Sequence, residues 1–157
     1  MPITIRAARP EDADVLTALN ADVQALHAAH KPTFFRPPDA SAVSVWFRER
    51  LSQPGARAWI AELDGRDVGY ALVVVRERPD TPFSVASRTY EIDQLGVDPT
   101  VRRRGVARAL VEHVLRDARN AGLREVTLRS WTFNKTAQRA FQRMGFTPEV
   151  VQMVARC

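Results

Sequence analysis

The feature that most constrains the fold of this chain is an uninterrupted apolar run at residues 70–75, Tyr-Ala-Leu-Val-Val-Val. A strand that is apolar throughout is typical of a sheet covered on both faces, because a strand with one wet face alternates apolar and polar residues. Residues 58–63 are also strand-like, and Asp64-Gly65 supplies a hairpin turn between residues 58–63 and 67–75. We therefore expect a hairpin at the centre of a sheet that is buried on both sides.

Other elements follow from apolar periodicity and from breaking residues. Asp39 and Asn134 are expected to cap helices, Gly122 and Gly145 to end them, and residues 76–88, which contain Pro79 and Pro82, to form a loop. The predicted order is strand 2–8, helices 10–30 and 40–51, strands 58–63, 67–75 and 89–97, helix 104–120, strand 124–130, helix 135–144 and strand 146–155. The sequence contains no internal repeat and no linker long enough to divide the chain into two domains.

Composition excludes some classes of protein. The 157 residues are 45% hydrophobic and 26% charged, as in an ordinary globular domain. No stretch approaches the roughly 18 consecutive apolar residues that span a bilayer, so no membrane association is expected. The first residues lack the pattern of a secretory signal, and the single Cys157 cannot form an internal disulfide. These features predict a cytoplasmic location.

The net charge of +5 indicates anionic partners, either nucleic acid or a small phosphorylated ligand. Arginine supplies most of the positive charge, since Lys31 and Lys135 are the only lysines. The densest basic cluster, residues 102–104, stands directly before Gly105 and a predicted helix. This placement favours one anion site over an extended basic surface, so nucleic acid is the less favoured partner.

The segment Arg102-Arg103-Arg104-Gly105-Val106-Ala107 has the chemistry of a pyrophosphate site. The first N–H groups of a helix lack partners and lie at the positive end of its dipole, where phosphate binds. Gly105 lets phosphate oxygens reach the backbone, and Ala107 is small. The segment is neither a nucleotide P-loop, which needs Gly-Lys-Ser/Thr, nor a dinucleotide fingerprint, which needs three glycines.

Residues 97–110, VDPTVRRRGVARAL, resemble the acetyl-CoA motif of the GNAT superfamily of N-acetyltransferases. That pattern is Arg or Gln, two residues, Gly, one residue, then Gly or Ala. Asn134, Ala137, Phe141 and Gly145-Phe146 match the spacing of the family's second motif. The resemblance is specific over residues 58–147 and weak over residues 10–55. It implies one α/β (α+β) domain over residues 1–157, with a mixed, mostly antiparallel sheet of about six to seven strands flanked by about four helices.

The resemblance also implies a function. The chain would be an acetyl-CoA-dependent N-acetyltransferase in which a primary amine of a small molecule or protein attacks the thioester directly and CoA is released. Residues 58–147 would bind the cofactor and residues 1–55 would form the acceptor side. The implied cofactor-binding residues are Leu95, Gly96, Val97, Arg102, Arg103, Arg104, Gly105, Val106, Ala107, Asn134 and Phe141. Family members often pair as dimers, so a homodimer remains open.

Amine acylation needs a neutral amine, and a base assists its deprotonation. Glu91 and Asp93 lie on a predicted strand, and their spacing of two places both carboxylates on one face provided that no bulge intervenes. Glu91 stands where several GNAT enzymes carry the base and is the first choice, whereas Asp93 could equally hold the acceptor's ammonium. The alternative is a structural ion pair with an arginine such as Arg88 or Arg129.

The sequence departs from the family at Phe141, where many members carry a tyrosine that protonates the departing thiolate. The Phe141 ring can still pack against the pantetheine arm, but water, Ser130 or Thr132 would have to supply the proton. This departure motivates an alternative function, a non-catalytic acyl-CoA-binding or regulatory module.

The acceptor side is predicted to include the aromatic residues Phe34, Phe35 and Trp46, which could equally close the core. His27 and His30 share a helix face, but a third metal ligand is not evident, so no metal is expected. The acceptor itself stays open among polyamines, amino acids, aminoglycosides and protein N-termini.

Overall fold

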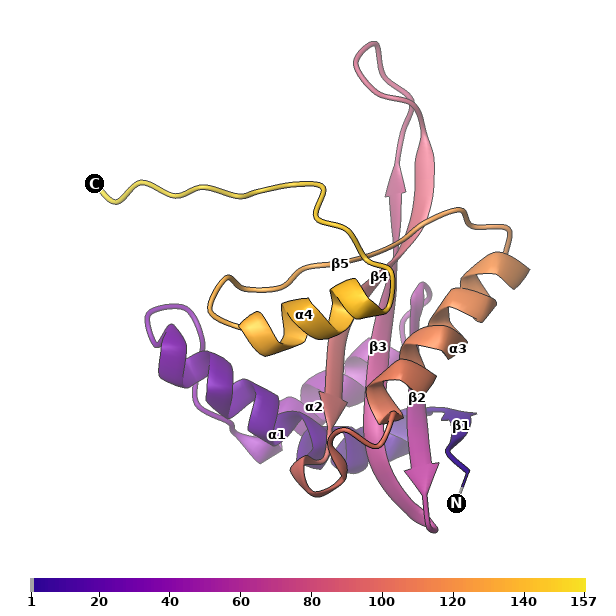
Figure 1. Ribbon diagram of the computed structural model, residues 1–157, viewed down its shortest axis with the longest axis vertical. Helices are drawn as coiled ribbons and strands as arrows, with labels where there is room; N and C mark the ends of the chain where they lie inside the picture. The colour runs from indigo at the N-terminus through magenta and orange to yellow at the C-terminus, as the bar shows by residue number, and fades with distance from the viewer. Residues whose placement is uncertain (1) are drawn as a thin grey trace.

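The apolar run at residues 70–75 lies in the middle strand of a five-stranded sheet (Figure 1). The structure is a computed structural model and describes residues 2–157. Strands β1 to β4 pair antiparallel in chain order, and β5 joins β4 in parallel. The elements are β1 (Thr4–Ala7), η1 (Pro10–Asp12), α1 (Ala13–His30), α2 (Ala40–Leu51), β2 (Ala56–Leu63), β3 (Arg66–Arg78), β4 (Ser87–Val97), η2 (Pro99–Val101), α3 (Val106–Asn120), β5 (Val126–Leu128) and α4 (Lys135–Arg143).

Both faces of the sheet are buried, as the apolar run predicts. Tyr70 and Leu72 point toward α1 and α2, and the alternate residues Ala71 and Val73 point toward α3 and α4. All four of these side chains have no solvent exposure. Helix α3 approaches β3 closely at Gly69, where a Cβ atom would lie 2.8 Å from Val106 Cγ1. The predicted α/β domain with a mixed, mostly antiparallel sheet and four helices is therefore confirmed.

The predicted count of six to seven strands is wrong, because residues 146–155 form no strand. Phe146 packs against Phe141, but after it the chain leaves the sheet and Val151 and Met153 are exposed (Figure 1). A β-prone sequence forms a strand only beside a neighbouring strand. The nearest edge, β5, is only three residues long instead of the predicted seven, so it offers little backbone to pair with.

The predicted loop at residues 76–88 is also too long. Strand β3 continues to Arg78 and β4 begins at Ser87, so the turn is confined to residues 79–86, which hold both prolines. Figure 1 shows this end of the hairpin projecting beyond the helices. The residues at this end can be polar because no helix covers them. The apolar pattern of the sequence therefore did not indicate how far the two strands extend.

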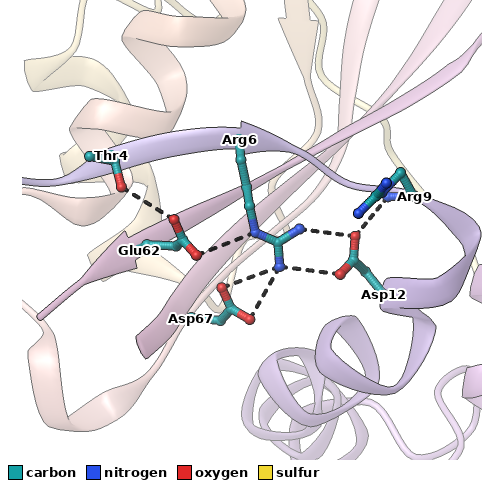
Figure 2. A network of polar contacts seen from close by, with 6 residues as sticks. All are labelled: Thr4, Arg6, Arg9, Asp12, Glu62 and Asp67. Atoms are coloured by element: carbon teal, nitrogen blue, oxygen red, sulfur yellow. Dashed lines mark hydrogen bonds and ion pairs between the residues drawn. The ribbon is translucent and has the colours of Figure 1, made fainter. Parts of the chain in front are cut away.

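A network of charged residues joins β1, η1, β2 and β3 (Figure 2). The Arg6 guanidinium donates to Asp12 at 3.0 Å and to Asp67 at 3.3 Å, and its Nε lies 3.5 Å from Glu62. Three carboxylates surround one guanidinium, so Arg6 offsets the repulsion among them.

Titration of this network follows from its contacts. Burial alone would raise the pKa of Asp12, but hydrogen bonds from the Arg6 guanidinium and from the Arg9 N–H outweigh burial and lower the pKa. A carboxylate whose pKa is lowered by folding stabilises the native state above its ordinary pKa, and this contribution is lost as the pH falls through the lowered value. The stabilisation by Arg6 should therefore be present at neutral pH and disappear in acid.

Replacing Arg6 by methionine keeps the apolar stem and leaves three carboxylates without their cation. We expect Arg6→Met to lower the free energy of unfolding by about 2 kcal/mol at neutral pH, and by much less at about pH 3, where carboxylates become protonated. Chemical denaturation at both pH values measures the difference. The control is Arg88→Met, whose partner Glu77 is 70% exposed and whose loss should stay below about 0.5 kcal/mol. A loss at Arg6 that does not change with pH would contradict this account.

Candidate functional site

Strand β4 contains a β-bulge at Asp93. Leu72 of β3 pairs with Gln94 and Val73 pairs with Ile92, so Asp93 is an extra residue without a partner on β3. A bulge bends its strand and changes the direction in which side chains point. The condition for placing Glu91 and Asp93 on one face, that no bulge intervenes, is therefore not met. The Glu91 side chain is only 12% exposed, whereas Asp93 is exposed.

The sheet opens immediately after this bulge. Strand β5 pairs with β4 only through Tyr90, Glu91 and Ile92. Across residues 94–97, β4 is paired with β3 on one side, and on the other side none of the strands within residues 2–157 adjoins it. Extended backbone with a free edge can hydrogen-bond to a ligand as it would to another strand. The backbone of Leu95, Gly96 and Val97 is thus available on one side for hydrogen bonds to a ligand, which their predicted role in cofactor binding requires.

Behind this open edge, on the side of α1, lies a buried cluster of polar side chains that was not predicted from the sequence. The Asn20 amide donates to the Tyr70 hydroxyl at 2.9 Å, and that hydroxyl donates to Gln94 Oε1 at 2.8 Å. Burial is the main reason that the pKa of Tyr70 is raised. These bonds connect α1, β3 and the residue that follows the bulge.

Gly96 has a packing role that is independent of any ligand. A Cβ atom on Gly96 would lie 2.6 Å from Tyr70 Cε1 and 2.9 Å from the carbonyl oxygen of Leu19. Tyr70 is fully buried and hydrogen-bonded, so it cannot move away. The glycine therefore allows α1 and β3 to pack directly behind the open edge of β4.

The segment after β4 leads to an uncapped helix terminus. Helix α3 begins at Val106, two residues later than predicted, and its N-cap Gly105 has φ of 85°. This left-handed conformation favours glycine, and a Cβ atom there would meet no atom within 4 Å. No side chain caps the helix, so its first N–H groups lie beside open space at the positive end of the dipole.

The three arginines before this terminus differ in the ion pairs that they form. Arg102 donates to Asp22 of α1 at 2.6 Å, and Arg104 lies 3.9 Å from Asp64. Both pairs are about half exposed and therefore weak. Arg103 has the left-handed φ of 65° and forms no ion pair with any residue in the described range 2–157. The terminus thus carries positive charge that can turn toward an anion.

Glu91 forms an ion pair, but with neither arginine named as its alternative partner. Arg76 of β3 donates to Glu91 Oε1 at 2.9 Å, and this hydrogen bond is the main reason that the pKa of Arg76 is raised. Arg88 pairs instead with Glu77. The cross-strand contact could have been predicted only from the register, because it depends on the pairing of β3 with β4.

Asn134 and Phe141 lie on α4. The Asn134 side chain accepts a hydrogen bond from the Ala137 N–H at 3.2 Å, which confirms its capping role. Its carbonyl oxygen keeps a second lone pair and its NH2 group keeps its N–H donors, so both can contact a ligand. Phe141 is partly buried and packs edge-on against Phe146, with ring centroids 5.8 Å apart.

Aromatic side chains gather where the end of α1 meets the segment between β5 and α4. We call this group the aromatic cluster; its members are His27, His30, Phe34, Phe35, Trp131 and Phe133. Ring centroids lie 4.6 Å apart for His30 and Phe133, and 5.2 Å apart for Phe35 and Trp131. Trp131 and Phe133 were not among the predicted acceptor residues.

Trp46, the third predicted acceptor residue, has different aromatic contacts. Its ring lies 5.3 Å from Phe47 and 4.9 Å from the Arg50 guanidinium, both of which belong to α2. The structure therefore brings Phe34 and Phe35 together with Trp131, and not with Trp46.

Comparison with known proteins shows which family this chain resembles. A model of the acetyltransferase (GNAT) family matches residues 23–146. N-acetyltransferase 8 from Homo sapiens is 35% identical over 96 residues, which are 61% of this chain and 40% of that protein. Mycothiol acetyltransferase from Cellulomonas flavigena is 29% identical over 97% of this chain and 42% of that protein. The chain thus spans less than half of either relative.

Solved structures share the fold. A mutant of the BH1408 protein from Bacillus halodurans superimposes with a TM-score of 0.92 at 19% identity, covering 98% of this chain and 99% of that one. Aminoglycoside N-acetyltransferase AAC(6')-Iy in complex with CoA gives a TM-score of 0.75 at 24% identity over 99% and 96% of the two chains. Within the described residues no helix has both the length and the apolarity to cross a membrane. Because the family model covers most of its length, the chain belongs to the GNAT acetyltransferase family.

Proposed function

We propose that this chain is an acetyl-CoA-dependent N-acetyltransferase that acts on a primary amine of a small molecule or protein. The observation that carries the proposal is the open edge of β4 after the Asp93 bulge, which continues directly into the uncapped start of α3. A cofactor with a pyrophosphate and an amide-bearing arm suits this pair of features. The pyrophosphate would bind at residues 103–107, and the arm would pair with the backbone of Leu95–Val97.

The comparisons support the same cofactor. The AAC(6')-Iy structure contains CoA, and the relatives are acetyltransferases by name. In this chain Asn134 would offer its amide to the arm and Phe141 would pack beside it.

Glu91 is the proposed base. Acetyl-CoA would supply an acetyl thioester, whose C–S bond breaks as the acetyl group passes to the amine. The acceptor's proton would pass to Glu91 directly or through water, and Arg76 would hold the carboxylate in place. Asp93 projects from the bulge and is exposed, which suits it to attract the acceptor's ammonium. Water, Ser130 or Thr132 would protonate the thiolate, since Phe141 has no proton to donate.

Phe141 also supports a second candidate function, an acyl-CoA-binding or regulatory module without turnover. The two candidates differ in one outcome. Incubation of the protein with acetyl-CoA and a mixed panel of amines, amino acids, aminoglycosides and peptides should yield an acetylated acceptor in mass spectrometry. Tight CoA binding with no acetylated product would favour the binding module.

Placing the pyrophosphate at α3 predicts that Gly105→Glu abolishes CoA binding, because the carboxylate would fill the anion site and repel phosphate. Calorimetric titration with CoA measures the loss. The matched control is Gly122→Glu at the opposite end of α3, where φ is 77° and a Cβ atom also meets nothing within 4 Å. Both variants should lose about 1 kcal/mol of stability from the strained backbone, but only Gly105→Glu should lose CoA. Unchanged affinity in Gly105→Glu would overturn the placement.

The role of Glu91 predicts that Glu91→Gln lowers kcat about 100-fold and leaves the Kd for CoA unchanged. The loss should be greatest at low pH, where less of the acceptor is a free amine. Steady-state kinetics across pH measures it. Arg76→Met removes the same ion pair but keeps the carboxylate, so its kcat should fall much less. Equal losses in the two variants would show that the ion pair is structural and that another group is the base.

A further inference from the structure

The aromatic cluster holds a cation in the free protein. The Lys31 Nζ lies 4.5 Å from the centroid of the Trp131 ring and 5.6 Å from that of Phe34. Both distances fall within the range of about 6 Å for cation–π attraction. No carboxylate in residues 2–157 forms an ion pair with Lys31, so the aromatic faces, and not an acid, surround this ammonium.

The segment that carries Trp131 begins beside the open edge of the sheet. Leu128 pairs with Ile92, the residue before the bulge, and Trp131 follows Leu128 by three residues. Three residues of extended chain reach at most about 11 Å. The Trp131 backbone therefore lies within about 11 Å of Leu128, the β5 residue that pairs beside the bulge.

The His27 imidazole does not oppose a cation in the cluster. Burial is the main reason that the pKa of His27 is lowered, and the neighbouring His30 lowers it further. His27 is therefore neutral at physiological pH. It stacks on Phe35 with ring centroids 4.8 Å apart, which extends the apolar wall.

We propose that the aromatic cluster selects an acceptor with two amino groups on an unbranched alkyl chain, and that one group, as an ammonium, replaces Lys31 over Trp131 and Phe34. The other amine then extends toward Glu91 and is acetylated. The Lys31 side chain is itself a primary ammonium on a four-carbon stem, so the cluster already accommodates this chemistry. The inference rests on the proposed function, and it adds the acceptor class and a competing internal cation.

Binding tests the inference without turnover. We would titrate the CoA-loaded protein with 1,4-diaminobutane, with its N,N,N-trimethyl derivative, which keeps one permanent cation, and with the neutral alcohol 1,4-butanediol, in which hydroxyls replace both amino groups. The first two probes should bind about three- to tenfold more tightly than the alcohol. Equal affinity for all three would overturn the inference.

Substitutions at Trp131, Phe34 and Lys31 test the position of the site. Trp131→Leu should weaken binding of 1,4-diaminobutane about three- to tenfold and leave the alcohol unaffected. Phe34→Leu, at a residue that is 65% exposed and therefore tolerant of change, should weaken it less. Lys31→Met keeps the stem, removes the competing charge and should tighten binding, whereas the control Lys135→Met, at the other lysine, should not. An unchanged Kd in both Trp131→Leu and Lys31→Met would contradict the site.

Acetylation assays separate the two proposals. If the diamine binds as predicted but is never acetylated, the function fails while the cation site remains. If 4-amino-1-butanol, whose far end is a neutral hydroxyl, is acetylated as efficiently as the diamine, the enzyme is established and the acceptor class is wrong.

Discussion

The structure depends on the unequal support of strand β4. Its backbone is paired with β3 from Ser87 to Val97, but with β5 only at Tyr90, Glu91 and Ile92. The bulge at Asp93 lies between the part of β4 that pairs with both neighbours and the part that pairs with β3 alone. The extra residue bends the strand at that point. Everything proposed for the site follows from this geometry: a free backbone edge, a carboxylate before the bulge, another on it, and a helix terminus beyond it.

An open edge in the centre of a domain needs a rigid wall behind it. Here the wall is Tyr70, which is fully buried and bonded to Asn20 and Gln94. The absence of a side chain at Gly96 lets that ring sit directly against β4. Packing on the α1 face thus holds β4 in place while the edge that faces away from β3 stays free, and Gly96 allows this packing beside the edge proposed to bind the cofactor.

Positive charge is arranged in two different ways at the start of α3 and at the aromatic cluster. At the start of α3 it is arginine beside exposed backbone N–H groups, which suits phosphate. At the aromatic cluster it is one lysine on π faces, which suits an alkylammonium. The α3 terminus therefore favours anions and the aromatic cluster accommodates a cation, which is consistent with the proposed reaction between a CoA thioester and an amine.

The sequence by itself determined the buried hairpin, the helices and their caps, and the glycine turn before α3, because these depend on periodicity and on local backbone chemistry. Tertiary structure alone decided the bulge, the pairing of Glu91 with Arg76, the Asn20–Tyr70–Gln94 cluster and the aromatic cluster. It also decided that residues 146–155 form no strand. Strand register and contacts between segments far apart in the chain set these features, and neither leaves a periodic signal in the residues themselves.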